Sequence, residues 1–165
     1  MKKRSCRFRA LWAVAGLAML SAGPLVAHHS FAMYDRNIQY VLTGVVENLN
    51  PDPSHLQIIF VPLNDARDAL VRDASGERVS WSVEMAGAGA SAREGITVGN
   101  FARGTVFSVG LMPLRNGQPG GARVGAIFRC PAGMAPEPGS HCDSVPGATR
   151  HGDDELAVPT ATWRP

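Results

Sequence analysis

Two adjacent histidines, His28 and His29, follow a stretch with the composition of a secretory leader. If the leader is removed after Ala27, His28 gains a free α-amine, and an α-amine with a pKa of about 8 is partly unprotonated at neutral pH. That amine and the Nδ1 of the same residue can chelate one metal ion, His29 can add a third nitrogen, and His55 can approach from a strand further along. Such nitrogen-rich, tetragonal ligation suits Cu(II) among the divalent metals. The simpler interpretation is a polar, mobile start of the mature chain, and the alternative is a metal site with copper as the candidate cofactor.

The first 27 residues are typical of a secretory signal peptide. Five basic residues fall within the first nine positions, and an apolar run from Ala10 to Leu20 precedes the small residues before the cut. This run is too short to span a bilayer, so we expect a periplasmic or secreted protein without a transmembrane segment once the signal is removed. The remaining 138 residues contain 11 arginines, no lysine and 14 acidic residues, a net charge of −3. That balance counts against a nucleic-acid binder, which needs a basic stripe to neutralise phosphates.

Cys130 and Cys142 are the cysteines of the mature chain. An even pair in an oxidising compartment predicts a disulfide. It would close a loop of about 13 residues and contribute on the order of 3 kcal/mol to stability. The alternative is a metal site that also uses His141. The adjacent pair His141 and Cys142 would make poor partners for one ion, and no second cysteine pair completes a tetrahedral set, so we favour the disulfide.

Glu84 and Arg115 are weaker candidates. Glu84 alternates with the apolar residues of its strand, so its simplest interpretation is a solvent-facing carboxylate. The functional alternative places Glu84 in a groove beside His55, as its hydrogen-bond partner or as a fourth metal ligand. Arg115 lies in an Asn-Gly turn and is most simply a solvated charge, with an anionic ligand as the alternative.

No convergent catalytic set emerges from the sequence. A triad of Ser30, His29 and Asp35 is disfavoured because adjacent residues of an extended arm point to opposite sides. We therefore expect no enzymatic activity. The expected function is a binding or accessory role toward a ligand or partner protein that the sequence does not identify. Copper binding through His28, His29 and His55 is the alternative from a different class.

Patterns of β-branched and alternating apolar residues predict five strands, over 38–49, 55–61, 79–85, 105–112 and 120–129. A short helix capped by Ser91 is expected within 86–95, between the third and fourth strands. Glycines inside the first strand, at Gly44, and inside the fifth predict bends or bulges. This element order is typical of an all-β fold, a small five-stranded OB-like barrel, with a small β-sandwich as the alternative. The chain then divides into a signal peptide (1–27), an arm (28–37), the barrel (38–129) and a disulfide-stapled loop and tail (130–165).

Several of these motifs resemble an uncharacterised family of small exported bacterial proteins. The mature chains of that family begin His-His-Ser-Phe, as residues 28–31 do, and continue into a Leu-x-Gly-x-Val strand, as residues 42–46 do. Residues 81–84 are similar to its Trp-x-x-Glu strand, and residues 113–117 to its Pro-Leu-Arg-Asp-Gly hairpin. The resemblance covers roughly residues 27–129 and implies export and the β fold, without an activity.

Two features depart from the family pattern. The family reads Trp-Thr-Asn-Pro-His after its first strand, whereas Asp52-Pro53-Ser54 here displaces the histidine to position 55. The loop between Cys130 and Cys142 is an addition.

Overall fold

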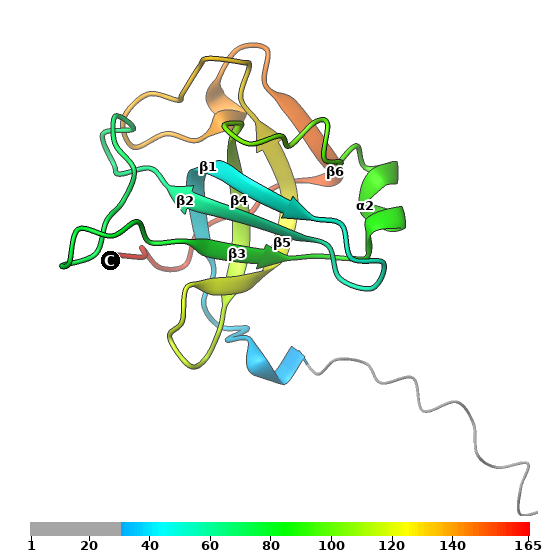
Figure 1. Cartoon of the computed structure of the whole chain (residues 1–165), viewed down its shortest axis with the longest axis horizontal. Helices are drawn as coiled ribbons and strands as arrows, with labels where there is room; N and C mark the ends of the chain where they lie inside the picture. Colours follow the sequence, from blue (N-terminus) through cyan, green and yellow to red (C-terminus); the bar gives the residue numbers. More distant parts are fainter. Residues whose placement is uncertain (1–30) are drawn as a thin grey trace, which may run out of the picture. The chain divides into compact units, whose positions relative to one another are not determined.

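The structure is a computed structural model that describes residues 31–165. In chain order its elements are η1 (Phe31–Met33), β1 (Tyr40–Asn50), β2 (Gln57–Pro62), β3 (Trp81–Glu84), α2 (Ala88–Arg93), β4 (Val106–Pro113), β5 (Gly120–Arg129), η2 (Cys142–Ser144) and β6 (Thr149–Leu156) (Figure 1). The five predicted strands are all present, and the fifth has the predicted bounds. No helix within residues 31–165 has the length and apolar character needed to cross a membrane.

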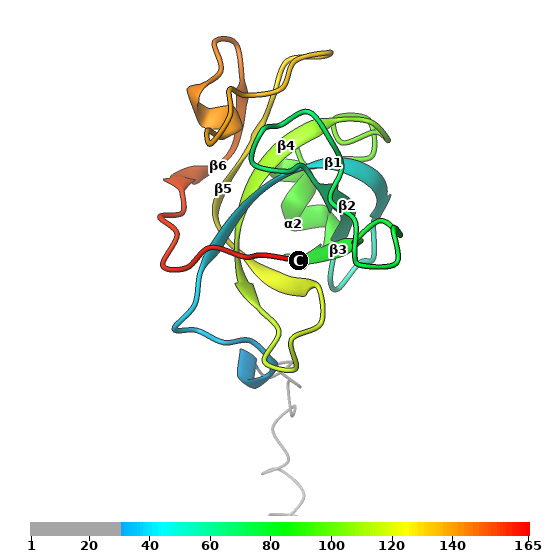
Figure 2. The ribbon, with the colours of Figure 1, turned by 90° about the vertical axis from the view of Figure 1, so that its left-hand side faces the viewer.

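The first five strands close into a barrel. Strand β1 pairs antiparallel with β2 and with β4, β2 pairs antiparallel with β3, and β4 pairs antiparallel with β5. A parallel pairing of β3 with β5 completes the ring. Figure 2 shows β4 and β5 curving around the interior. The predicted small all-β barrel, with one short helix between its third and fourth strands, is confirmed.

A sixth strand was not predicted. Strand β6 pairs antiparallel with the outer edge of β5, where Ile127 lies opposite His151. The sequence of β6 (TRHGDDEL) is polar, and His151 is its one buried residue. An edge strand with most side chains in solvent lacks the apolar alternation by which strands are recognised, and its charges protect the free edge against pairing with other chains.

Of the bend or bulge predicted at Gly44, no bulge falls at that residue. The pairing with β4 runs unbroken from Tyr40 to Val45, the pairing with β2 begins at Gly44, and the irregularity falls between Val46 and Asn48. Gly125 of β5 does match its prediction: it has a positive φ of 69°, and the pairing with β6 shifts beside it. Glycine adopts this backbone conformation without a Cβ penalty, so the strand can bend there.

Ser91 does not cap helix α2, contrary to the prediction. The N-cap is Gly87, and Ser91 lies buried within the helix, where its hydroxyl donates to the carbonyl of Ala86. A serine can satisfy its hydroxyl on an upstream carbonyl of this kind inside a helix.

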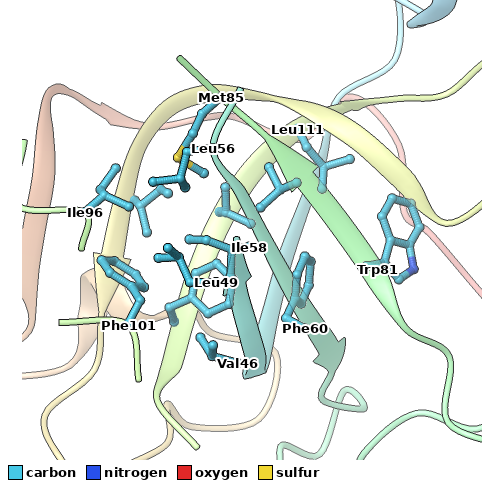
Figure 3. Close-up of a cluster of buried hydrophobic side chains, with 14 of the residues drawn as sticks. Val46, Leu49, Leu56, Ile58, Phe60, Trp81, Met85, Ile96, Phe101 and Leu111 are labelled. Atoms are coloured by element: carbon cyan, nitrogen blue, oxygen red, sulfur yellow. The ribbon is translucent and has the colours of Figure 1, made fainter. Parts of the chain in front are cut away.

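The barrel interior is apolar. Figure 3 shows the side chains of β1 and β2 gathered at its centre, with Trp81 at one end and Phe101 at the other. Aromatic rings meet edge to face across this core, as Phe60 and Phe107 do at a centroid distance of 5.1 Å. Such ring pairs add to the stability gained from burial alone.

The predicted disulfide between Cys130 and Cys142 is present. It holds the loop from β5 to η2 against the outside of the barrel, where the Cys142 N–H donates to the Ser108 hydroxyl of β4 at 2.8 Å. The half-cystines pack with Val145 in a small apolar cluster of their own.

Candidate functional site

His55 and Glu84 meet where β2 begins and β3 ends. Glu84 is the last residue of β3 and pairs with Gln57, two residues after His55. The His55 Nδ1 lies 3.0 Å from the Glu84 Oε1, and about a third of each side chain remains exposed. The sequence interpretation that placed Glu84 beside His55 describes this geometry. The simpler one, of a carboxylate facing only solvent, does not.

The turn before His55 is built by Asp52. Its Oδ1 accepts hydrogen bonds from the backbone N–H groups of Ser54, at 2.8 Å, and His55, at 3.0 Å. These two N–H groups lower the pKa of the Asp52 carboxyl because they stabilise its ionised form, and the Ser54 N–H has the larger effect. The Asp52-Pro53-Ser54 segment thereby fixes the backbone from which the histidine projects.

The same turn packs against the start of α2. The Ala88 N–H donates to the Asp52 carbonyl at 3.0 Å, and a Cβ on Gly87 would lie only 1.9 Å from the Pro53 carbonyl oxygen. A glycine is therefore required at position 87 for this close approach. The contact holds the His55 turn in a fixed place relative to the end of β3.

Tyr34 is the third member of the site. It is 5% exposed, and its hydroxyl donates to the Glu84 carboxylate. Burial first, and then the negative charge and hydrogen bond of Glu84, raise the pKa of the Tyr34 phenol to about 12. Tyr34 is not among the residues predicted from the sequence. The available signal was an aromatic side chain with a polar tip, which seeks a hydrogen-bond partner when it is buried.

The arm around Tyr34 is pinned to the turn between β4 and β5. Tyr34 forms a β-bridge with Leu114, and the Asp35 N–H donates to the Pro113 carbonyl at 2.8 Å. Arg115 adds two hydrogen bonds. Its backbone N–H donates to the Met33 carbonyl at 2.9 Å, and its side-chain Nε donates to the Ala32 carbonyl at 3.1 Å. Arg115 is thus engaged in holding the arm and is not simply a solvated turn charge.

A histidine that donates its Nδ1–H to a carboxylate presents the other ring nitrogen, Nε2, as a lone-pair donor. This carboxylate–histidine pairing is the usual second contact of a metal-ligating histidine, because it fixes the ring and its tautomer. The His55 Nδ1 lies at hydrogen-bond distance from the Glu84 Oε1, as such a pairing requires, and Tyr34 contacts the same carboxylate. Within residues 31–165 no three histidine, cysteine or acidic side chains are grouped so that they could hold a metal ion. The other predicted ligands, His28 and His29, lie outside the described residues.

Comparison with known proteins gives one match. The model of a family of unknown function (DUF6152) matches residues 16–123. The matched range contains Tyr34, His55, Glu84 and the arm, and it stops before the disulfide loop and β6. No curated protein and no solved structure matches the chain.

Proposed function

This chain belongs to the DUF6152 family of unknown function, and we propose that it is an exported, non-enzymatic β-barrel protein that binds one Cu(II) ion beside His55. The observation that carries this proposal is the 3.0 Å contact between the His55 Nδ1 and the Glu84 Oε1. It gives the partly exposed Glu84 carboxylate, at the end of β3, a partner other than solvent.

In this proposal the protein ligands are nitrogens. His55 supplies Nε2, His28 supplies its α-amine and ring once the leader is removed, and His29 supplies a further ring. Glu84 holds the His55 ring in place and is not itself a ligand. Nitrogen-rich ligation of this kind favours Cu(II) over the other divalent metals of the first row.

The placement of Tyr34 supports the arm's part in the site. Tyr34 is fixed on Glu84 and lies six residues after His28. His28 lies three residues before Phe31, where η1 begins. An extended chain covers at most about 3.5 Å per residue, so His28 can reach points within roughly 10 Å of Phe31. The Cys130–Cys142 disulfide is consistent with export to an oxidising compartment.

The test is a Cu(II) titration of two purified forms, one beginning at His28 and one with a single alanine added before it. We expect one tight equivalent for the first form and marked weakening for the second, because the added residue separates the α-amine from the His28 ring. Since an Ala-His-His terminus places a histidine third, where terminal Cu(II) sites also form, the electron paramagnetic resonance spectrum is recorded with each affinity.

Variants locate the ion within the barrel. His55→Gln should weaken binding at least tenfold and change the spectrum, while Glu84→Gln should weaken it less because the ligand itself is retained. Glu155→Gln, at an exposed carboxylate on β6, is the matched control and should have no effect. Weak binding that is equal in both terminal forms and unchanged by His55→Gln would contradict the copper site. The barrel would then be treated as a binding domain for a partner protein or another ligand.

A further inference from the structure

A cavity of about 450 Å³ opens on the outside of the barrel and shares no lining residue with the His55–Glu84 pair. Its floor is β1 around Thr43, and its walls are the segment after β2, the disulfide loop and the C-terminal tail. The tail, red in Figure 2, runs back across the barrel from β6, and Trp163 packs edge to face on Trp81 at 5.2 Å. The volume falls in the range of sites that hold small molecules.

A buried hydrogen-bond chain ends at His141 on the cavity wall. The Cys142 N–H donates to the Ser108 hydroxyl, which lies 2.7 Å from the Thr43 hydroxyl, and Thr43 lies 2.8 Å from the His141 Nδ1. Ser108 is fully buried, and its hydroxyl proton is satisfied if it donates to Thr43. Thr43 must then donate to the His141 Nδ1, so the ring proton is on Nε2. Burial, followed by the nearby charge of Arg67, lowers the pKa of His141 and thereby favours the neutral form of the ring.

Two arginines, Arg67 and Arg164, line the cavity, and Arg67 is the one held by hydrogen bonds. Its Nε and Nη2 donate to the Ser140 carbonyl at 3.0 and 2.8 Å, and its Nη1 donates to the Asn64 carbonyl at 3.1 Å. Within residues 31–165 no carboxylate lies within ion-pair distance of this guanidinium, so neutral carbonyls alone fix it in place. Three of its five N–H groups are used by these bonds, which leaves two for another acceptor.

The backbone of Arg67 has a left-handed φ of 62°, which is uncommon for a residue other than glycine. Such a backbone conformation persists where several surrounding contacts hold it, and residues in this conformation concentrate at ligand sites. The Arg67 N–H closes a turn on the Asn64 carbonyl at 3.0 Å, and the Gly139 N–H donates to the Asp65 carbonyl at 2.9 Å, which ties this segment to the disulfide loop.

We propose that this cavity binds a small organic carboxylate, with its anionic end on Arg67 and the His141 Nε2–H and its apolar body against Trp163 and Leu63. The planar fork of a guanidinium matches a carboxylate in geometry. The Asp65 side chain on the same wall disfavours a dianion such as a phosphate monoester. The disulfide loop and the tail lie beyond the residues that match the family, whereas Thr43 and Arg67 lie within them.

The probe is 4-phenylbutyrate, with its neutral amide as the matched control, titrated calorimetrically into the protein beginning at His28. We expect saturable binding of the acid with a Kd below about 1 mM and binding of the amide at least tenfold weaker, because only the acid offers a charge to Arg67. Phenyl phosphate, the dianion control, should bind more weakly than the acid.

Two variants place the ligand. Arg67→Gln and His141→Gln should each weaken 4-phenylbutyrate binding at least fivefold, whereas Arg72→Gln, at an exposed arginine of the same segment, should not. If Arg67→Gln fails to fold, His141→Gln and the comparison of acid with amide still decide the matter. Equal affinities for acid and amide, no saturable binding up to about 20 mM, or binding unaffected by either variant would overturn the proposal.

Discussion

The ring of Phe60 packs directly against Gly44 on the neighbouring strand. A Cβ on Gly44 would lie 2.5 Å from the Phe60 Cδ2 and 2.7 Å from the Val61 carbonyl oxygen. Phe60 is fully buried and also packs on Phe107, so its ring has little room to move aside. Gly44→Ala should therefore overpack the core and lower the free energy of unfolding by about 1–3 kcal/mol, as measured by urea denaturation.

Gly89 is the matched control for that substitution. It lies within α2, and a Cβ there would meet nothing within 4 Å. Gly89→Ala should raise stability by about 0.5–1 kcal/mol, because alanine loses less backbone entropy in a helix. Equal losses for the two substitutions would mean that the Gly44 effect does not arise from contact with Phe60.

The barrel could be predicted from the sequence because each of its first five strands shows its buried face in apolar residues. In β3, Trp81 and Val83 point inward and alternate with Ser82 and Glu84. Strand β6 could not be predicted because its pairing is carried by backbone hydrogen bonds along an edge, where side chains impose little pattern.

The site was harder to predict than the fold. The spacing of His55 and Glu84 in sequence says nothing of their contact, which arises from the β2–β3 register and from the turn that Asp52 holds. Tyr34 reaches Glu84 only because the arm bridges to Leu114, a long-range pairing without a local sequence signal. The Thr43–His141 bond joins residues 98 positions apart and depends on the disulfide loop.

Removal of the disulfide should both destabilise the barrel and abolish ligand binding in the cavity lined by Arg67 and His141. Cys130→Ala with Cys142→Ala should lower the free energy of unfolding by about 3 kcal/mol, the loop-closure value for this separation. The double variant should also lose 4-phenylbutyrate binding, because the loop carries His141 and the carbonyl that fixes Arg67. Wild-type protein in reductant should reproduce both losses. A stable double variant that binds the probe normally would show that the loop keeps its place without the bridge.

Stability should fall as the pH drops from about 7 toward 5. Burial, as the first cause, lowers the pKa values of both His141 and His151 below the ordinary value of about 6.5. Below that value the unfolded chain takes up protons that the folded chain does not, so acid favours unfolding. Each histidine can contribute a slope of up to about 1.4 kcal/mol per pH unit.

The assignment of that slope is tested on His151, which is 4% exposed and has its Nδ1 3.0 Å from the Glu94 carbonyl oxygen. Urea denaturation of His151→Gln between pH 7.5 and 5 should show a shallower dependence than wild type, whatever its absolute stability. The carboxyls of Asp52 and Asp73 have lowered pKa values and affect stability only below about pH 4, outside this window. An unchanged slope in the variant would exclude His151 as a source.

Tyr34→Phe separates the hydroxyl contact with Glu84 from the packing of the ring. An absorbance titration of wild type should contain a phenol phase with a pKa of about 12, and the variant should lack it. Because the folded pKa lies above the ordinary value of about 10, wild-type stability is retained below pH 10 and declines as the pH rises toward 12, where the unfolded chain ionises first. The variant should lose this alkaline decline while its stability at pH 7 falls by about 0.5–1.5 kcal/mol, the net value of one hydrogen bond.

Copper affinity of the Tyr34→Phe variant should fall severalfold, since Glu84 would lose one of the groups that fix it and would hold His55 less firmly. Unchanged affinity together with loss of the alkaline phase would show that Glu84 orients His55 without help from the arm.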